Sequence, residues 1–312
     1  MSIEIGGSSI GEVYLGNDAI SEIYKGNDLV WSSYIPEINY IFRDIDENGK
    51  LTLATGTLED SSDIAKLKDY GLAGAFYNCS GVTGGVSFPN LKTVENEGCF
   101  SYAFYGCSGL TSISFPNLTE VRGNASFESA FQECTKLTTV SFPKLLEVKG
   151  SESFRSIFGE CSNLNTLDLS SLTTINGARN LYNVCQYCTK LSTVDLSSLT
   201  TISGGSNFYG GFMYCKNLTN LSFPKLKNIQ ASTIFQSVFY ECRSLKSLSF
   251  PALTSSSFGS FTNQFKYMLY SVVGCTVHFP SNLQSIIGSW SDVTSGFGGA
   301  NTTVLFDLPA TE

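Results

Sequence analysis

Apolar positions recur along this chain at a nearly constant interval. Seven cysteines mark it: the first step is 28 residues and the other five are 27. A Phe, or once a Cys, stands three residues before each of them, and a Phe or Leu stands seven residues before. A fixed period in this range is typical of stacked-repeat proteins, in which each repeat buries its apolar face against its neighbours. The cysteines are Cys79, Cys107, Cys134, Cys161, Cys188, Cys215 and Cys242.

Each repeat contains a strand, a corner and a return segment. Val140 and Phe142 alternate with polar residues, which predicts a strand with one buried face. In five repeats a proline follows the strand, where it cannot donate a ladder hydrogen bond and ends the pairing. On the return, Phe127, Phe131 and Cys134 are spaced i, i+4 and i+7, which predicts one face of a short helix. We therefore expect an α/β repeat fold, a solenoid of about seven to eight coils built from strand, turn and short helix.

One motif of the repeat resembles a known family. Residues 103–116 read Ala-Phe-Tyr-Gly-Cys-Ser-Gly-Leu-Thr-Ser-Ile-Ser-Phe-Pro, which is similar to the repeat core of the BspA-like leucine-rich repeat family. The resemblance covers roughly residues 70–255 and implies a leucine-rich-repeat solenoid of a kind found on bacterial surfaces and in some bacteriophage proteins. Repeats four and five depart from the motif, because they lack the proline and read Asp168-Leu-Ser-Ser and Asp195-Leu-Ser-Ser.

The regular interval divides the chain into four expected parts. Residues 1–34 are a β-rich N-terminal attachment module, and residues 35–70 are a junction and N-terminal cap. Residues 71–255 form the leucine-rich-repeat solenoid. The interval fails after Leu253, so residues 256–312 are expected to form a degenerate repeat and a C-terminal cap, since solenoids need atypical end repeats to shield the core.

A tandem duplication occupies the N-terminal module. Residues 10–19 and 20–29 each read as a short alternating strand closed by Gly-Asn-Asp, a turn sequence that tolerates positive φ. This segment is too small to be stable alone. It resembles the element that opens tail and virion proteins of gut bacteriophages, which implies attachment to a virion; a hairpin that caps the solenoid is the alternative. The attachment residues would be Ile10, Tyr14, Ile20, Tyr24 and Trp31.

Composition narrows the classes of partner. The chain has 27 Asp and Glu against 19 Lys and Arg and no basic run, so we expect no nucleic-acid binding. No apolar stretch approaches the ~20 residues needed to cross a bilayer, so we expect no membrane insertion. The first residues lack the basic and apolar segments of a secretory signal peptide. This favours a virion protein assembled in the host cytoplasm over an exported bacterial surface protein.

The cysteines suggest packing rather than chemistry. Cys185 and Cys188 have the Cys-x-x-Cys spacing of redox and zinc sites, but Cys185 occupies a position held by Phe in the other repeats. No second pair and no His follows at ligand spacing, so we expect no metal and no cofactor. Cys99 lies outside the interval, and we expect it to be the reactive thiol. Whether any cysteine is oxidised stays open.

Catalytic chemistry has few candidates. The single histidine, His278, offers one weak partner for a nucleophile. Asp168 with Asp195, and Glu120 with Glu147, would lie about 5 Å apart in stacked coils, close to the separation in retaining glycosidases. That spacing arises wherever adjacent repeats share an acid, so it carries little information. We expect no enzyme and no catalytic residues.

Binding through the solenoid surface is therefore the leading hypothesis. Tyrosines one or two residues before the cysteines would line the return side, and Asp168 and Asp195 the outer strand face. Tyr combines apolar area with a polar tip and suits interfaces. The alternative is that the tyrosines only pack over the ridge. The candidate binding residues are Tyr77, Tyr105, Tyr187, Tyr214, Tyr240, Asp168 and Asp195.

Three functions remain open at this point. The leading one is a bacteriophage virion structural protein, a tail or fibre component. Its N-terminal module would bind other virion proteins, and its solenoid a host cell-surface protein or glycan. The alternatives are a BspA-like adhesin on the bacterial cell surface and a hydrolase of surface polysaccharide. The sequence leaves open whether the protein forms a homotrimer.

Overall fold

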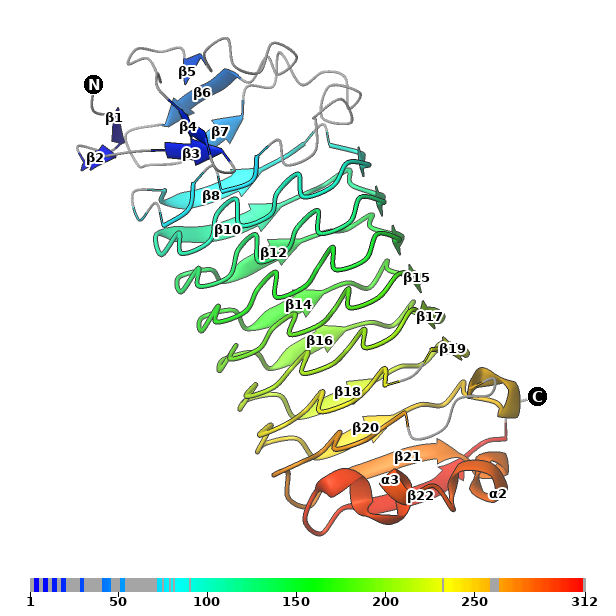
Figure 1. The fold of residues 1–312 in the computed structure, drawn as a ribbon. Coiled ribbons are helices and arrows are strands. Elements are labelled where there is room, and N and C mark those ends of the chain that lie inside the picture. Colours follow the sequence, from blue (N-terminus) through cyan, green and yellow to red (C-terminus); the bar gives the residue numbers. More distant parts are fainter. Residues whose placement is uncertain are drawn as a thin grey trace.

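The computed structural model describes strands β1–β7 within the first 53 residues as backbone elements. It then describes residues 72–310 except 75, 79, 81, 90, 232 and 259–263. From residue 72 onward, successive coils stack along one axis to form the expected solenoid, and the strand labels rise steadily from β8 to β22 along it (Figure 1). The predicted leucine-rich-repeat solenoid is confirmed, with far less helix than the repeat pattern suggested.

The first side of each coil is a parallel strand. Neighbouring strands pair in register, so that Ile113 lies opposite Val140 and Ser114 opposite Ser141. The inward residues Val140 and Phe142 are buried, as predicted. We call this side the strand face. Its strands are β8 (Gly84–Ser87), β10 (Leu110–Ser114), β12 (Thr139–Ser141), β14 (Thr166–Asp168), β16 (Thr193–Asp195), β18 (Asn220–Ser222), β20 (Ser247–Ser249), β21 (Thr276–Pro280) and β22 (Thr303–Leu308).

A second parallel sheet forms the next side. After the corner, the chain turns inward at Leu118 and Val121, and both side chains are fully buried. Unlike the strand face, this sheet is continuous over six coils. Its strands are β9 (Thr93–Val94), β11 (Glu120–Val121), β13 (Glu147–Val148), β15 (Thr174–Ile175), β17 (Thr201–Ser203) and β19 (Asn228–Gln230).

The return segment is a chain of turns, so the predicted short helix is wrong. Left-handed residues recur every four positions, at Ala125 (φ 48°), Ser129 (φ 51°) and Glu133 (φ 61°). Phe127 and Phe131 still point into the core and are fully buried. The i, i+4, i+7 spacing thus reflects a four-residue repeat of turns, which places every fourth side chain inward much as a helix would.

Hydrogen bonds explain why turns replace the helix. The Phe127 N–H donates to the Ser153 carbonyl of the next coil at 2.9 Å, whereas the Glu128 N–H donates locally to Ala125 at 3.1 Å. A helix would direct all its N–H groups along its own axis. Alternating local and inter-coil bonds make the return a third bonded side of the stack. Those bonds offset the roughly 1–2 kcal/mol that a non-glycine residue loses in the left-handed region.

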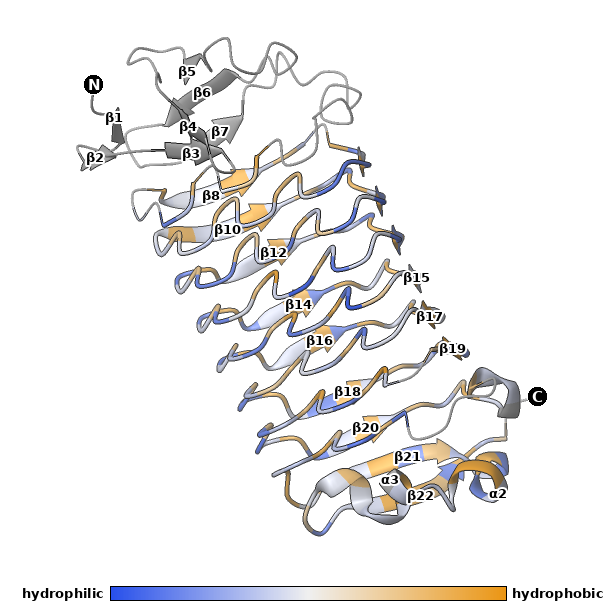
Figure 2. Ribbon diagram, viewed as in Figure 1, coloured by the Kyte–Doolittle hydropathy of each residue, from blue (hydrophilic) through white to orange (hydrophobic). Residues whose placement is uncertain are grey.

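Phenylalanines stack through the core at the spacing of the coils. The rings of Phe88 and Phe115 are 4.8 Å apart and nearly parallel, and Phe115 and Phe142 are 5.0 Å apart. Phe223 and Phe250 continue the same column further along at 5.1 Å. Parallel strands are separated by about 4.8 Å, so a planar ring fits one coil step. The hydropathy colouring shows apolar inward positions recurring along the strands of this face (Figure 2).

Two coils in the middle interrupt this column. They carry Leu169 and Leu196 where the flanking coils carry Phe. The strand face breaks into separate sheets at both boundaries, between β12 and β14 and between β16 and β18. A branched aliphatic side chain cannot continue a stack of planar rings, so the bonded ladder opens on this side. The second sheet holds the coils together across both breaks.

Short elements flank the coils at both ends. At the N-terminal end, β1 (Ile3–Ile5) pairs with β2 (Ser8–Ile10), β3 (Val13–Leu15) with β4 (Asp18–Ile20), and β5 (Leu29–Val30) with β6 (Ile41–Ile45). β7 (Leu51–Leu53) pairs with β6 and runs parallel to β8. At the other end the short helices are η1 (Ser255–Phe258), η2 (Ser281–Leu283), α2 (Gln284–Ile287), α3 (Ser291–Thr294) and η3 (Gly296–Gly298). The four-part division of the chain stays a prediction.

Candidate binding surfaces

The cysteine column is part of the core. The Cys134 thiol donates to the Phe104 carbonyl of the previous coil at 3.1 Å, and the Cys161 thiol donates to Phe131 at the same distance. The same bond recurs at Cys107, Cys188, Cys215 and Cys242. Cysteine therefore combines a small apolar side chain with a weak donor that satisfies a buried carbonyl. Cys79 lies outside the described residues.

Burial raises the pKa of several of these thiols. Desolvation raises the pKa of Cys134 to about 12, and it raises the pKa of Cys185 well above its usual range. A thiolate is the reactive form, so such groups are poor nucleophiles and metal ligands. Cys185 and Cys188 are both fully buried and free of a disulfide. Packing, rather than redox chemistry, accounts for their Cys-x-x-Cys spacing.

The expectation that Cys99 is a reactive thiol is wrong. Its side chain is fully buried, and its thiol donates to the Asn96 carbonyl at 3.3 Å. Cys99 belongs to a second 27-residue register that continues at Ser126 and Ser153. Ser126 donates to the same Asn96 carbonyl at 2.9 Å. The signal was present in the sequence, because Asn180 and Asn207 extend this register of small polar side chains.

The Glu120 and Glu147 pair is an ion-pair cluster. The two residues lie directly opposite each other in β11 and β13, as the repeat predicts. Lys149 lies between them, with its Nζ 2.5 Å from Glu120 and 2.7 Å from Glu147. A hydrogen bond from Arg122, aided by Lys149, lowers the pKa of Glu120. A carboxyl group with a lowered pKa is unsuited to act as the general acid of a glycosidase.

His278 continues the outer column of the strand face. It lies opposite Ser249 of the preceding strand, and its Nδ1 is 3.0 Å from both carboxylate oxygens of Asp307 on the next strand. Both side chains are partly exposed, at 25% and 45%. This contact ties β21 to β22.

Asp168 and Asp195 hold the corners of the two middle coils. They lie opposite each other in β14 and β16, as predicted. Each carboxylate accepts the backbone N–H two residues on, from Ser170 at 2.9 Å and from Ser197 at 2.8 Å. In the flanking coils a proline stands at the repeat position of Ser170 and Ser197, and proline has no N–H to satisfy. An aspartate therefore replaces the proline corner with a local side-chain turn.

From residue 72 onward, every tyrosine lies on a return segment. The five predicted tyrosines are there, and Tyr77 and Tyr187 are 50% and 42% exposed. The repeat reading missed five more on the same side, although Tyr182 and Tyr209 share one repeat position 27 residues apart. The complete set is Tyr77, Tyr102, Tyr105, Tyr182, Tyr187, Tyr209, Tyr214, Tyr240, Tyr267 and Tyr270. We call this side the tyrosine face.

These tyrosines form two clusters. Tyr77 stacks on Tyr105 at 4.9 Å in the first coils, and the Tyr105 hydroxyl donates to Glu133. In the later coils Tyr187 stacks on Tyr214 at 4.5 Å. Tyr240 and Tyr270 extend that column, and Tyr182 and Tyr209 stack beside it. The rings therefore pack on one another, and several remain exposed. Binding through them stays a prediction.

The predicted attachment residues cannot be assessed in the same way. Ile10, Tyr14 and Ile20 fall in strands β2, β3 and β4, of which only the backbone is described. Tyr24 and Trp31 lie outside the described residues. β3 and β4 pair antiparallel, with Leu15 opposite Asp18. The predicted Gly-Asn-Asp turn of the first copy falls on residues 16 and 17, which lie outside the described residues.

Comparison with protein families settles the assignment of the repeats. Six copies of the "BspA type Leucine rich repeat region" match over residues 72–210, 128–269 and 209–289. The chain belongs to the BspA-type leucine-rich repeat family. The matched region spans the coils that the sequence interval marked, and it includes the middle coils without the proline. Among curated proteins, no relative matches this BspA-type chain.

Solved structures similar to this BspA-type protein come from bacteria. A Treponema pallidum leucine-rich repeat protein is 23% identical, with a TM-score of 0.40, covering 66% of this chain and 81% of that one. A leucine-rich cell surface protein from Faecalibacterium prausnitzii A2-165 is 17% identical, with a TM-score of 0.30, covering 76% and 82%. A leucine-rich repeat protein from Bacteroides ovatus is 17% identical, with a TM-score of 0.25, covering 75% and 86%.

Two features of the described part of the chain bear on its partners. Within it, no helix is both long and apolar enough to cross a membrane. Nor do the described side chains include a group of three or more His, Cys, Asp or Glu that could hold a metal ion.

Proposed function

We propose that this BspA-type protein is an adhesin of the bacterial cell surface that binds a partner protein through its tyrosine face. The observation that carries this proposal is that all ten tyrosines from residue 72 onward lie on the return segments. Tyrosine is enriched at recognition surfaces because it offers a large, rigid contact area and a polar tip. The adhesin is favoured over a virion protein because the family match covers the repeats, whereas the virion hypothesis depends on the N-terminal duplication.

The stacking of the rings indicates the kind of partner. Tyr187 and Tyr214 cover each other's faces, so the column presents ring edges and hydroxyl groups. A sugar ring stacks on an open aromatic face, whereas a protein surface can contact edges and hydroxyls over a wide area. Tyr267 and Tyr270, at 49% and 45% exposure, extend the contact area toward the C-terminal coils. We therefore favour a protein over a glycan as the partner of this face.

Cell binding by tyrosine variants tests the proposal. Fluorescently labelled protein would be incubated with a panel of cultured epithelial and bacterial cells, and binding would be measured by flow cytometry. Tyr187→Ala with Tyr214→Ala should weaken binding at least about tenfold, in line with the loss of two central aromatic contacts. Ser114→Ala with Ser141→Ala on the strand face is the matched control and should bind like the parent.

Pretreatment of the cells distinguishes the partner class. Protease treatment should abolish binding, and glycosidase treatment should leave it intact. Full binding by a folded tyrosine variant, or loss only after glycosidase, would contradict the proposal. Because the Tyr187→Phe and Tyr214→Phe variants keep the rings, they separate the contribution of the hydroxyl groups.

The virion hypothesis is the second candidate, supported by the duplication of residues 10–29. Proteomics of purified phage particles tests it directly, since a structural component should be present in fixed stoichiometry. We further propose that the protein is not an enzyme, which is supported by the ion pairing of Glu120 and Glu147 with Lys149. Release of reducing sugar from capsular polysaccharide by the purified protein would contradict this.

A further inference from the structure

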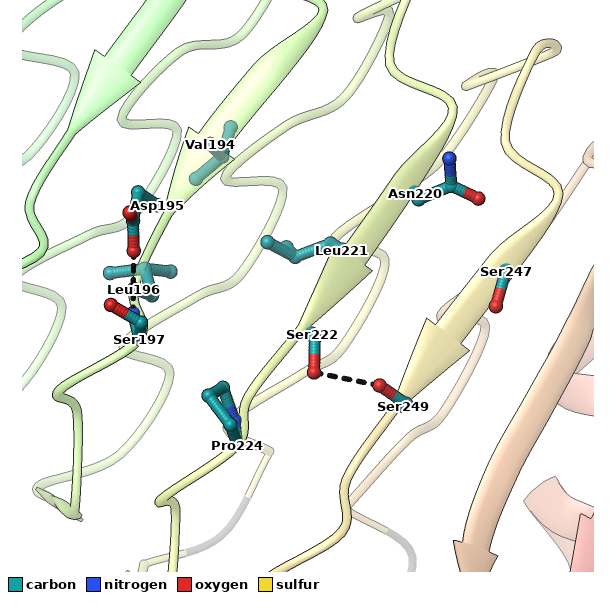
Figure 3. Close-up of a pocket in the computed structure, with 10 residues that line it drawn as sticks. All are labelled: Val194, Asp195, Leu196, Ser197, Asn220, Leu221, Ser222, Pro224, Ser247 and Ser249. Atoms are coloured by element: carbon teal, nitrogen blue, oxygen red, sulfur yellow. Dashed lines mark hydrogen bonds between the residues drawn. The ribbon is translucent and has the colours of Figure 1, made fainter.

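A depression of about 340 Å³ opens on the strand face where β16 and β18 meet (Figure 3). It lies on the side of the coil that does not carry the tyrosines. Its lining comes from β16, β18 and β20 and from the corners that follow β16 and β18. The depression coincides with one of the two breaks in the strand face, so it follows from a change in the core rather than from an inserted loop.

The opening is confined to one side of the stack. Across the same coil boundary, Ile202 still pairs with Ile229 in the second sheet, and the Tyr214 N–H donates to the Tyr240 carbonyl at 2.8 Å. On the strand face, however, Val194 and Leu221 are 8% and 5% exposed, although both point into the core. The second sheet and the return keep the two coils in place. Val194 and Leu221 form a small apolar floor of the depression.

Backbone groups are left without their usual partners at this break. In neighbouring coils the residue after the strand donates to the next strand, as from Leu169 to the Asp195 carbonyl at 3.0 Å and from Phe223 to Ser249 at 2.9 Å. Within the described structure, no such bond joins the Leu196 N–H to the Ser222 carbonyl. One donor and one acceptor therefore stay available at the depression.

Three side chains add further groups: Asp195 and Asn220 offer acceptors, and Ser222 offers a donor. Asp195 uses Oδ1 to accept the Ser197 N–H, which fixes the carboxylate and leaves Oδ2 free to accept another bond. Ser249 donates to the Ser222 hydroxyl at 2.7 Å, so the Ser222 proton can be donated elsewhere. Asn220 donates to Thr219 at 3.1 Å, which leaves its carbonyl oxygen as an acceptor. Figure 3 shows these groups on neighbouring strands around one hollow.

We propose that this depression binds one or two residues of a neutral sugar chain. Each sugar hydroxyl both donates and accepts, which matches these donors and acceptors, and a fixed carboxylate can accept from two adjacent hydroxyls. The C–H surface of a sugar can rest on Leu221 and Val194. The negative charge of Asp195 opposes binding of an anionic ligand. The volume lies at the small end of ligand sites, about 300–1,000 Å³.

An added peptide strand does not fit the same place. Inserting a strand would require β16 and β18 to be separated by two strand spacings, about 9.6 Å in total. The pairing of Ile202 with Ile229 holds the two coils one spacing apart. We therefore expect single hydroxyl groups of the ligand, and not an added peptide backbone, to bond the unpaired N–H and carbonyl groups.

Saturation-transfer NMR on the intact chain tests the site. The probes are the methyl glycosides of glucose, galactose, mannose and N-acetylglucosamine, with glucuronate as the anionic comparison. The repeat offers matched controls: Asp168→Asn for Asp195→Asn, and Ser141→Ala for Ser222→Ala. Both asparagine variants retain an oxygen for the corner N–H. The two variants at the depression should lower the affinity at least about fivefold, the loss expected for one hydrogen bond, while both controls bind like the parent.

Three results would overturn the proposal. One is that no neutral glycoside receives saturation from the parent protein. Another is that the variants at the depression and their controls bind equally. The third is that glucuronate binds more tightly than the neutral glycosides. The site is independent of the adhesin proposal, since Tyr187→Ala with Tyr214→Ala should retain sugar binding and Asp195→Asn should retain cell binding.

Discussion

The two middle coils and the coils that flank them share one 27-residue repeat, but they differ in the side chain that fills the core and in the residues that form the corner. The flanking coils stack Phe115 on Phe142, and Phe223 on Phe250, and turn the corner with proline. The middle coils carry Leu169 and Leu196 and turn the corner with an aspartate that accepts a backbone N–H. The strand face is interrupted where the two types meet.

This difference shows how a solenoid acquires a local site without a loop insertion. The second sheet continues through six coils, including both breaks, and the return bonds continue beyond it, so the stack keeps its register. The strand face alone is interrupted where the core side chain changes from a ring to a branched chain. The depression lies at this break, and the coil that carries Leu196 in its core also carries Asp195 beside the depression.

The largest expected effect comes from removing a stacked ring. Phe115 is fully buried between Phe88 and Phe142, so Phe115→Ala should cost about 3–5 kcal/mol of unfolding free energy. Leu196→Ala, beside the break, should cost less, about 2–3 kcal/mol, because its surroundings can relax. Urea denaturation followed by circular dichroism measures both. An equal or reversed order would show that the leucine core is packed at least as well as the ring core.

Converting the middle core into the flanking type should close the strand face. Leu169→Phe with Leu196→Phe continues the ring stack through both boundaries, at an overpacking cost of about 1–3 kcal/mol. The backbone N–H at position 196 should then be protected from exchange, and sugar binding at the depression should be lost. Retained binding together with a fast-exchanging N–H would mean that the ring-to-leucine change does not cause the break.

The corner can be exchanged independently of the core. Asp168→Ala removes the acceptor of the Ser170 N–H and should cost about 1 kcal/mol. Asp168→Ser with Ser170→Pro recreates the flanking corner and should recover that loss, because proline has no N–H to satisfy. Thermal denaturation of the single and double variants tests the pair. A double variant less stable than Asp168→Ala would show that the middle backbone cannot accept proline.

The smallest effect concerns charge in a flanking coil. Arg122, aided by Lys149, lowers the pKa of Glu120 from its usual 4.5, so the stabilisation is full above that value and is lost as the pH falls through the lowered pKa. Glu120→Gln should therefore be less stable than the parent at pH 7 and equal to it at strongly acidic pH. Glu160→Gln, which lies outside this ion-pair cluster, is the control for the loss of one carboxylate at pH 7.

The sequence predicted the coil but not its return. The interval of cysteines and phenylalanines indicated which residues face inward, and Phe127, Phe131 and Cys134 are all buried as expected. Their spacing could not separate a helix from a four-residue repeat of turns. Glycines at return positions, such as Gly98 and Gly106 with φ of 61° and 69°, were the available signal for left-handed turns.

The candidate sites were predicted in part. The tyrosine face and the Asp168–Asp195 pair follow from repeat position, and the structure places them where expected. The sequence pattern did not show that each aspartate accepts the backbone N–H two residues later, which is what stabilises the corner. The depression at β16 and β18 depends on a missing ladder bond, which the sequence indicates only through the change from Leu196 to Phe223.

Residue-resolved amide exchange tests the central claim, that the strand face opens where ring and leucine cores meet. Hydrogen–deuterium exchange with electron-transfer fragmentation would compare five backbone N–H groups at the same repeat position. We predict fast exchange at Phe142 and Leu196 and slow exchange at Phe115, Leu169 and Phe223, which donate to the next coil at 2.9 to 3.0 Å. Equal protection at all five would contradict the account.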